Sequence, residues 1–290
     1  PDYIYQALIT PNDTYYAERQ WNLRQINAES AWDITTGSSA VTIAIVDTGV
    51  DLTHPDLADK IVAGYDFVNN DSDPSDDEGH GTHVAGIAAA VSNNGKGVAG
   101  VSWGALIMPV KVLSWLGIGT VSDISSGIRW AANHGAQVIN LSLGSDNSSY
   151  TLRSAVNYAH GQGALVVAAV GNEYDEGNAT TYPAAYDHVL AVAATGAEDE
   201  HAYYSNTGSY VDVAAPGGNP SGSGDTDPRH WITSTYYDFW FDVQTYVGAA
   251  GTSQASPHVA GLGALVWSLD GSLTNDEVEQ IIESTALDLG

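Results

Sequence analysis

The 290-residue sequence contains no cysteine, which excludes disulfides, thiolate catalysis and cysteine-ligated zinc. It also has no apolar run long enough to cross a membrane. Basic residues are scarce, because 8 Lys and Arg stand against 35 Asp and Glu, and the formal net charge is −27. A surface of this charge repels nucleic acid and anionic lipid, so we expect neither nucleic acid nor a membrane as a partner.

The acidity leaves two interpretations open. An acidic enzyme that acts outside the cell would carry this charge, and so would a protein adapted to high salt, where counterions screen self-repulsion. The chain does not start with a basic segment followed by an apolar one, so we expect any signal peptide to be absent already. With 290 residues, 43% of them hydrophobic, the chain can form one large core.

Strand-like and helix-like segments alternate along the sequence. Apolar, mostly β-branched runs predict strands at 41–46, 105–113 (interrupted by Pro109), 136–141, 164–170, 189–194 and 211–215. Helical patterns occupy 28–33, 80–91, 122–132, 152–159, 253–267 and 274–284, the last with Thr274 and Glu277 as a capping box. This alternation predicts an α/β fold of three layers, with a mostly parallel central sheet flanked by helices. We expect 217–227 to be a loop.

Four polar residues stand at the ends of these predicted elements. Asp47 follows the first strand and Asn172 follows the strand at 164–170, while His80 and Ser253 begin helices. Such strand ends are where open α/β sheets bind ligands. Taken singly, Asp47 fits a turn and Ser253 fits a helix cap. Together they provide an acid, a base and a nucleophile in chain order.

The motifs around these residues resemble those of the subtilisin-like serine proteases: Asp47-Thr-Gly, His80-Gly-Thr-His, Ala169-Val-Gly-Asn172 and Gly251-Thr-Ser253. The stretches at 10–13, 19–21, 31–33 and 54–57 resemble the thermitase-like branch. The resemblance covers residues 9 to 288 and implies a catalytic domain over 9–290, with 1–8 a propeptide remnant or N-terminal extension. An α/β-hydrolase is excluded, because the residues around Ser253 do not read G-x-S-x-G.

The resemblance assigns a role to each residue. Ser253 is the nucleophile, His80 the general base, and Asp47 the carboxylate that orients it. The Asn172 amide and the Ser253 N–H form the oxyanion hole. The family likeness further implies a secreted, monomeric serine endopeptidase that cleaves polypeptides through an acyl-enzyme, with its own propeptide as folding aid and inhibitor. Two alternatives are a peptide-binding pseudoenzyme, against which the complete triad argues, and a processing domain within a larger surface protein.

The resemblance also places the substrate as an added β-strand between two edges. One edge is formed by Ser142, Leu143 and Gly144, and the other runs over 113–119 with Leu113, Gly117 and Gly119. The pocket for the P1 side chain is expected from 142–145 and 168–170, including Ala169, with Thr181 at its base. Because these residues are small or neutral, we expect an apolar or aromatic P1 residue.

Calcium is the implied cofactor, since it takes several oxygen ligands from flexible loops. The first expected site uses the side chains of Asp13, Asp56 and Asn94 with the carbonyls of Val91, Lys96 and Val98. The second uses Asp66, Asn69, Asp71 and Asp73, with Ser75 as a further candidate. A third family site is in doubt because Gly196 replaces an expected acid. The alternative for each acidic loop is a solvated surface.

Three further residues bear on the motifs. By family likeness, His83 and His258 are structural rather than catalytic. Gln254 stands after the nucleophile where most relatives carry methionine, which removes an oxidisable thioether from the site. The longer, aromatic segment at 217–246 leaves three roles open: to rim the site, to contact a partner or to cover the core.

Overall fold

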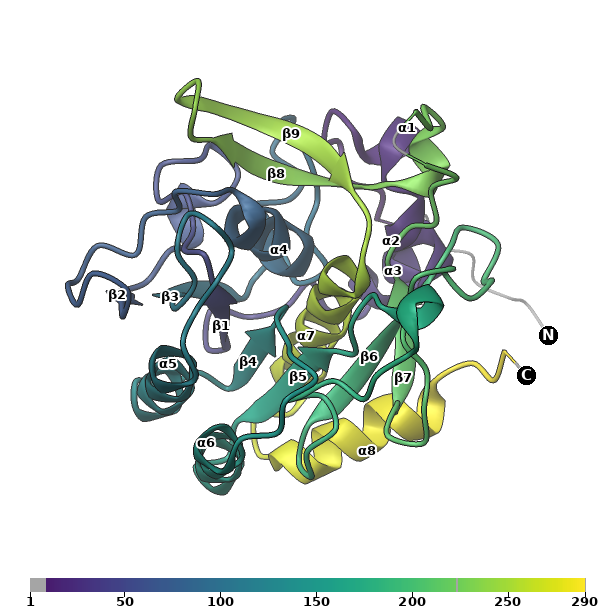
Figure 1. The fold of residues 1–290 in the computed structure, drawn as a ribbon. Helices are drawn as coiled ribbons and strands as arrows, with labels where there is room; N and C mark the ends of the chain where they lie inside the picture. Colours follow the sequence, from purple (N-terminus) through teal and green to yellow (C-terminus); the bar gives the residue numbers. More distant parts are fainter. Residues whose placement is uncertain (1–8, 223, 290) are drawn as a thin grey trace.

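A parallel seven-stranded sheet forms the centre of the computed structural model, which describes residues 9–222 and 224–289 (Figure 1). The expectation of a propeptide remnant at 1–8 lies outside these residues. The strand order is β2-β3-β1-β4-β5-β6-β7, and every pairing is parallel. The strands are β1 (Thr42–Asp47), β2 (Tyr65–Asp66), β3 (Leu106–Lys111), β4 (Val138–Leu141), β5 (Leu165–Ala169), β6 (Leu190–Thr195) and β7 (Val213–Pro216).

Helices cover both faces of this sheet (Figure 1). They are α1 (Tyr16–Arg19), α2 (Trp21–Gln25), α3 (Ala28–Trp32), α4 (His80–Ala89), α5 (Val121–Asn133), α6 (Tyr150–Gly161), α7 (Thr252–Leu269) and α8 (Asn275–Thr285). Alternate side chains of β1 divide between the two faces, because successive residues of a strand point to opposite sides. Ile43 and Ile45 join the core beneath α4, α7 and α8, whereas Ala44 and Val46 join the core beneath α5 and α6.

The three-layer α/β prediction is therefore confirmed, with few local differences. Pro109 does not interrupt its strand: it lies inside β3, at a register where the pairing with β2 has not yet begun. The capping box is present, since Thr274 Oγ1 accepts the Glu277 N–H and Glu277 accepts the Thr274 N–H. The short helices α1 and α2 lie where the sequence shows no clear periodicity.

The expected insertion at 217–246 contains a β-hairpin. Strands β8 (Ile232–Asp238) and β9 (Val243–Ala249) pair antiparallel, and β8 packs on α4 (Figure 1). Ser234 Oγ and Thr235 Oγ1 donate to the carbonyls of His83 and Thr82 at 2.7 Å each. Because Ile232 is fully buried, the hairpin covers core, and its tip at 239–241 leaves three aromatic side chains exposed.

The helices of the described chain are all too short or too polar to serve as membrane spans.

Candidate active site

The expected acid and base meet at the carboxyl edge of the sheet. Asp47 is the last residue of β1 and is fully buried, while His80 is the first residue of α4. Asp47 Oδ1 and His80 Nδ1 lie 2.7 Å apart, and the Thr48 N–H also donates to Asp47 Oδ1 at 2.7 Å. A carboxylate on Nδ1 leaves Nε2 as the ring nitrogen that can take a proton from a nucleophile.

A second aspartate, which the sequence did not single out for a role in catalysis, fixes the start of α4. Asp76 is buried, and its carboxylate accepts the N–H groups of Gly79 and Thr82 at 2.9 Å each. The Asp76 carboxylate also accepts a hydrogen bond from the Thr48 hydroxyl at 2.8 Å. The oxygen of that hydroxyl accepts the Gly81 N–H at 2.9 Å. Thr48, the residue after the expected acid, is thereby joined to the helix that carries the expected base. An aspartate just before a helix is the signal that could have indicated this role.

The surroundings of His80 shift its proton affinity. Burial lowers the pKa of His80, but the charge and hydrogen bond of Asp47, with smaller contributions from Glu78 and Asp76, raise it overall to about 9. His83 and His258 are the reverse case: burial lowers the pKa of each to about 4. Their rings bond to the Val247 carbonyl and to the Gln254 carbonyl, respectively, in keeping with structural roles.

Ser253 lies in the first turn of α7 rather than at its cap, which is Gly251. Its hydroxyl donates to the Ser142 carbonyl at 3.2 Å, and Ser142 Oγ donates back to the Ser253 carbonyl at 2.9 Å. Ser142, expected as a substrate edge, therefore also holds the nucleophile. For its proton to reach His80, the Ser253 hydroxyl must rotate away from this carbonyl, as catalytic hydrogen bonds often do on substrate binding.

The fourth expected residue, Asn172, is fixed by its amide oxygen. Asn172 Oδ1 accepts the N–H of Thr252 at 2.8 Å and its hydroxyl at 3.0 Å. This arrangement leaves the Asn172 NH2 group as a donor for a ligand, close to Ser253. The first N–H groups of α7 have no intrahelical partners, so the Ser253 N–H is a second donor. Thr252, which the sequence did not single out, thus orients the oxyanion donor.

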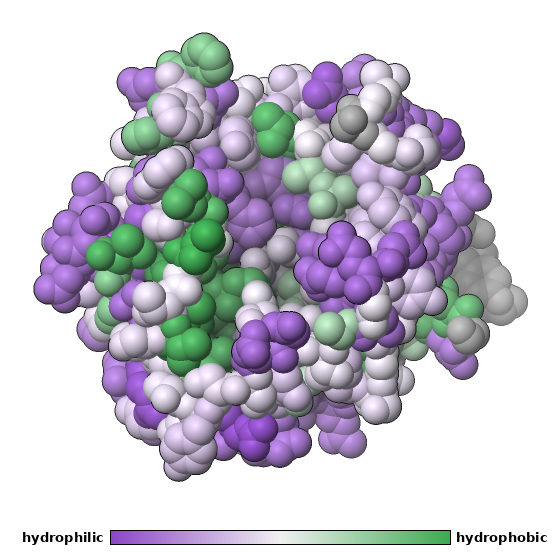
Figure 2. All heavy atoms as spheres, viewed as in Figure 1, coloured by the Kyte–Doolittle hydropathy of each residue, from purple (hydrophilic) through white to green (hydrophobic). Residues whose placement is uncertain are grey.

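A cavity of about 500 Å³ contains His80 and most of the expected substrate residues. Six of the eight line it, namely Leu113, Gly117, Gly119, Ser142, Leu143 and Gly144. Ala169 and Thr181 are buried and do not line it. The Thr181 side chain packs against Gly144, and Tyr182, the residue after Thr181, lines the cavity instead. Exposed apolar side chains follow the 115–121 edge, and Figure 2 shows apolar residues gathered around a hollow on this face.

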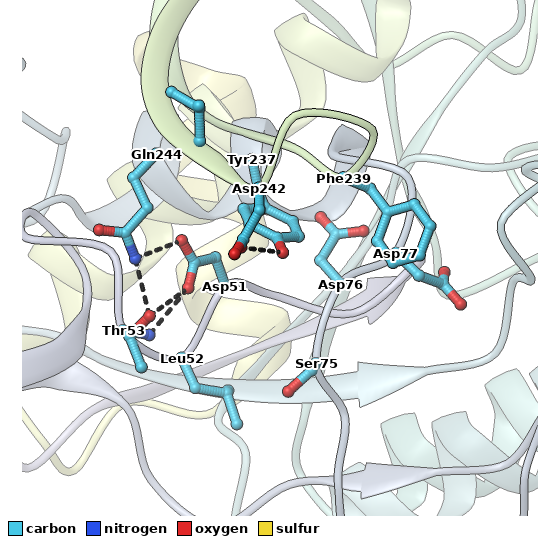
Figure 3. A pocket seen from close by; sticks show the side chains of 11 residues that line it. Asp51, Leu52, Thr53, Ser75, Asp76, Asp77, Tyr237, Phe239, Asp242 and Gln244 are labelled. Carbon is cyan, nitrogen blue, oxygen red and sulfur yellow. Dashed lines mark hydrogen bonds between the residues drawn. The ribbon is translucent and has the colours of Figure 1, made fainter.

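A larger cavity, of about 610 Å³, lies under the hairpin and contains none of the four catalytic candidates. The hairpin residues Tyr237, Phe239 and Gln244 form one side, and residues 51–53 and 75–77 form the other (Figure 3). Gln244 Nε2 donates to Asp51 at 2.9 Å. The hairpin therefore also rims a hollow beside α4, the helix that begins with His80, and contact with a partner stays open as the third role.

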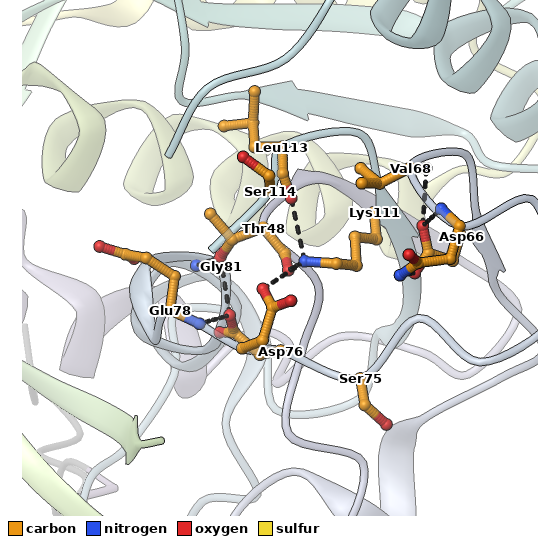
Figure 4. Close-up of polar contacts among 12 residues, drawn as sticks. Thr48, Asp66, Val68, Ser75, Asp76, Glu78, Gly81, Lys111, Leu113 and Ser114 are labelled. Atoms are coloured by element: carbon orange, nitrogen blue, oxygen red, sulfur yellow. Dashed lines mark hydrogen bonds and ion pairs between the residues drawn. The ribbon is translucent and has the colours of Figure 1, made fainter. Parts of the chain in front are cut away.

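A buried lysine, Lys111, bonds to the chain directly after Asp47. Lys111 Nζ donates to the carbonyls of Thr48 and Leu113 at 2.6 and 2.9 Å and pairs with Asp77 at 2.5 Å (Figure 4). It therefore joins the end of β1, one substrate edge and the loop before α4. From the sequence, Lys111 appeared only as a residue of a predicted strand.

The residues of the first expected calcium site come together around two buried carboxylates. Asp56 Oδ1 accepts Asn94 Nδ2 at 2.9 Å, and Asp56 Oδ2 accepts the Val98 N–H at 3.1 Å. Asn94 Nδ2 also lies 3.0 Å from the Val91 carbonyl, and Asp13 accepts the Asn93 N–H at 2.7 Å. Within the described ranges, no basic side chain pairs with either carboxylate. Two buried carboxylates without a basic partner, beside the Val91 carbonyl, are ligands that suit a hard cation, but the Asn94 amide would have to turn, because its oxygen accepts the Lys96 N–H.

The second expected site is more open. The Asp66 carboxylate accepts the N–H groups of Val68 and Asn69, while Asp71 and Asp73 are exposed and cap the turns that follow them. Within the part of the chain that the structure describes, no group of three or more acidic, histidine or cysteine side chains is arranged to hold a metal. Either site would therefore depend on carbonyl or amide oxygens as well.

Comparisons with known proteins agree with this geometry. Residues 38–290 match the model of the Subtilase family. Thermitase from Thermoactinomyces vulgaris is 49% identical over 278 residues, which cover 96% of this chain and 91% of thermitase. A solved structure of proteases from Pseudoalteromonas arctica PAMC 21717 superposes with a TM-score of 0.88 at 38% identity, covering 97% of this chain and 93% of that one.

Other relatives are longer than this chain. The thermophilic serine proteinase of Bacillus sp. (strain AK1) is 48% identical over 287 residues, which are 99% of this chain but 66% of that protein. Halolysin from Haloferax mediterranei is 44% identical over 292 residues, which are 99% of this chain and 52% of halolysin. The chain thus spans just under two thirds of the first and about half of the second.

Proposed function

Since the chain belongs to the subtilase family of serine proteases, we propose that it is a secreted, calcium-stabilised serine endopeptidase that acts through an acyl-enzyme. The observation that carries the catalytic part of the proposal is the 2.7 Å contact between Asp47 and His80, at a cleft whose lining residue Ser142 is hydrogen-bonded to Ser253. The apolar cleft favours an apolar or aromatic P1 residue. The acidic composition supports secretion, and so does a 40% identical relative from Natrialba magadii that is named a halolysin-like extracellular serine protease. A propeptide would be the folding partner.

The geometry supports two chemical steps. Ser253 Oγ attacks the peptide carbonyl carbon while His80 Nε2 takes the serine proton, and the new oxyanion is bound by the Asn172 NH2 group and the Ser253 N–H. His80 then gives this proton to the leaving amine, and the C–N bond breaks. In the second step a water molecule, deprotonated by His80, attacks the ester, and Ser253 recovers its proton. Asp47 stabilises the imidazolium in both steps.

An assay of peptide hydrolysis tests the proposal directly. We expect cleavage of casein and of succinyl-Ala-Ala-Pro-Phe-p-nitroanilide, with an initial burst of nitroaniline equal to the enzyme concentration wherever deacylation is slow. A serine-directed phosphonofluoridate should abolish cleavage of both substrates, and the Ser253 peptide should gain the mass of the reagent less HF, because Ser253 Oγ displaces fluoride from phosphorus. Tight peptide binding without hydrolysis would instead indicate a pseudoenzyme.

The pH dependence follows from His80. Only neutral His80 can accept the serine proton, and because its pKa is raised to about 9, we expect kcat/KM to increase from pH 6.5 through about 9 before it levels off. The measurement is kcat/KM for a substrate without titratable groups, at constant ionic strength. A plateau already reached at pH 6.5 would show that Asp47 does not raise the proton affinity of His80.

We expect calcium removal to lower the melting temperature. A ligand held at 100 times its Kd adds about 2.7 kcal/mol to the free energy of unfolding. With an unfolding entropy of about 2.1 cal/mol/K per residue, this corresponds to roughly 4 °C in a chain of 290 residues. Calorimetry with calcium and with EDTA measures the shift. Asp56→Asn should remove most of the EDTA effect if the first site dominates, and Asp71→Asn reports on the second. Identical melting temperatures in calcium and EDTA would contradict both sites.

A further inference from the structure

The substrate cleft has one negatively charged side chain. Among the described residues that line it, Glu78 is the single carboxylate, and the other lining side chains are apolar, small or uncharged apart from His80. Glu78 is half-buried, and across the described chain no lysine, arginine or histidine forms a salt bridge with it. Its charge is therefore available to a ligand.

Hydrogen bonds hold Glu78 in place at the cleft wall. Its Oε2 accepts the His80 N–H at 2.8 Å, which leaves Oε1 for another partner. Its carbonyl accepts the hydroxyl of Tyr236, from the hairpin, at 3.1 Å. A carboxylate fixed in this way loses little conformational entropy when it binds a cation, so the entropic cost of binding is small.

The position of Glu78 relative to the nucleophile identifies the substrate residue that it meets. The attacked carbonyl, which belongs to P1, must lie between Ser253 Oγ and the Asn172 amide. Successive side chains of an extended peptide point to opposite sides. If the P1 side chain enters the pocket beside residues 142–145, the P2 side chain turns toward the lining residues of the other segments, which include His80, Leu113 and Glu78.

We propose that Glu78 makes P2 a specificity position for lysine or arginine. A long basic side chain can lay its methylene groups against Leu113 and place its charged end at Glu78 Oε1, since such side chains bury their stems while the charge stays at a polar partner. This inference rests on the proposed peptidase function, and it adds a charge requirement that the apolar P1 pocket does not provide.

The test compares three peptides that differ only at P2, which is lysine, its neutral isostere norleucine, or glutamate, with phenylalanine at P1. For the wild type we expect kcat/KM to be about fivefold higher for lysine than for norleucine, as for a partly exposed ion pair, and lowest for glutamate. Glu78→Gln keeps an acceptor for the His80 N–H and should bring the lysine-to-norleucine ratio close to 1. The ratio is independent of the His80 protonation state, because both substrates meet the same enzyme.

Asp146→Asn is the matched control, since it removes the same charge from a residue that stands in sequence between two other lining residues, Ser145 and Asn147. We expect it to keep the wild-type ratio. An equal fall in both variants would overturn the assignment to Glu78 in favour of the overall acidic field, and so would a wild type that cleaves the norleucine peptide without preferring lysine. If none of the three peptides were cleaved, the peptidase function itself would be overturned.

Discussion

Ser253→Ala is expected to lower kcat for peptide hydrolysis by about 10⁶-fold, the scale on which loss of a triad nucleophile acts. Without Oγ no acyl-enzyme can form, and the oxyanion donors of Asn172 and the α7 start are left with only a poorly activated water as nucleophile. A residual rate of roughly 10³-fold over the uncatalysed reaction should persist from these donors. The fold should be retained, because the variant loses one hydrogen bond, that to the Ser142 carbonyl.

Single-turnover hydrolysis with the succinyl peptide anilide measures this loss, and calorimetry checks the fold. Ser268→Ala is the control, as it makes the same change near the other end of α7, where Ser268 Oγ donates to the Leu265 carbonyl. It should hydrolyse the substrate at the wild-type rate. Normal turnover by Ser253→Ala would overthrow the assignment of the nucleophile.

The second large effect is expected from Asp47→Asn, with kcat reduced by about 10⁴-fold near neutral pH. Asp47 Oδ1 accepts the Nδ1–H of His80 at 2.7 Å, and an asparagine amide that donates instead would leave the proton on Nε2, the nitrogen that must act as base. The variant also loses the charge that raises the pKa of His80, so burial should shift the acid limb of the pH profile downward.

Profiles of kcat/KM against pH for wild type and Asp47→Asn separate the two consequences, because the tautomer affects the plateau and the lost charge affects the midpoint. Asp212→Asn serves as the control. The Asp212 carboxylate lies beside β6, away from β1, and accepts the Ala191 N–H at 2.8 Å. An Asp47→Asn enzyme with an unchanged plateau would show that the carboxylate does not set the His80 tautomer.

The sequence predicted those parts of the site that depend on local pattern. Asp47, His80, Asn172 and Ser253 stand at ends of elements whose apolar periodicity is strong, and parallel strands bring such ends to one edge. The supporting contacts could not be read in this way. Thr48 and Asp76 are 28 residues apart in sequence, and the bonds of Lys111 to the Thr48 carbonyl and to Asp77 depend on how β1, β3 and a loop pack.

The hairpin shows a different limit. Its strands contain Thr, Ser and Tyr in place of the aliphatic runs of the central sheet, so the segment 232–249 lacks the pattern of a doubly buried strand. It forms because its polar side chains bond to carbonyls of α4, an interaction between segments about 150 residues apart. Likewise, Thr181 was expected at the cavity, but chain direction presents its neighbour Tyr182 there.

The burial of Lys111 has a practical consequence for covalent attachment. The sequence contains three lysines, and Lys60 and Lys111 are only 5% and 1% exposed, with their amines bonded to carbonyl oxygens. Lys96 is exposed, on the loop that would carry the first calcium site. An amine-reactive dye or resin should therefore modify a single lysine of the folded protein, Lys96, and the α-amino group of the chain is the other amine that competes for the reagent.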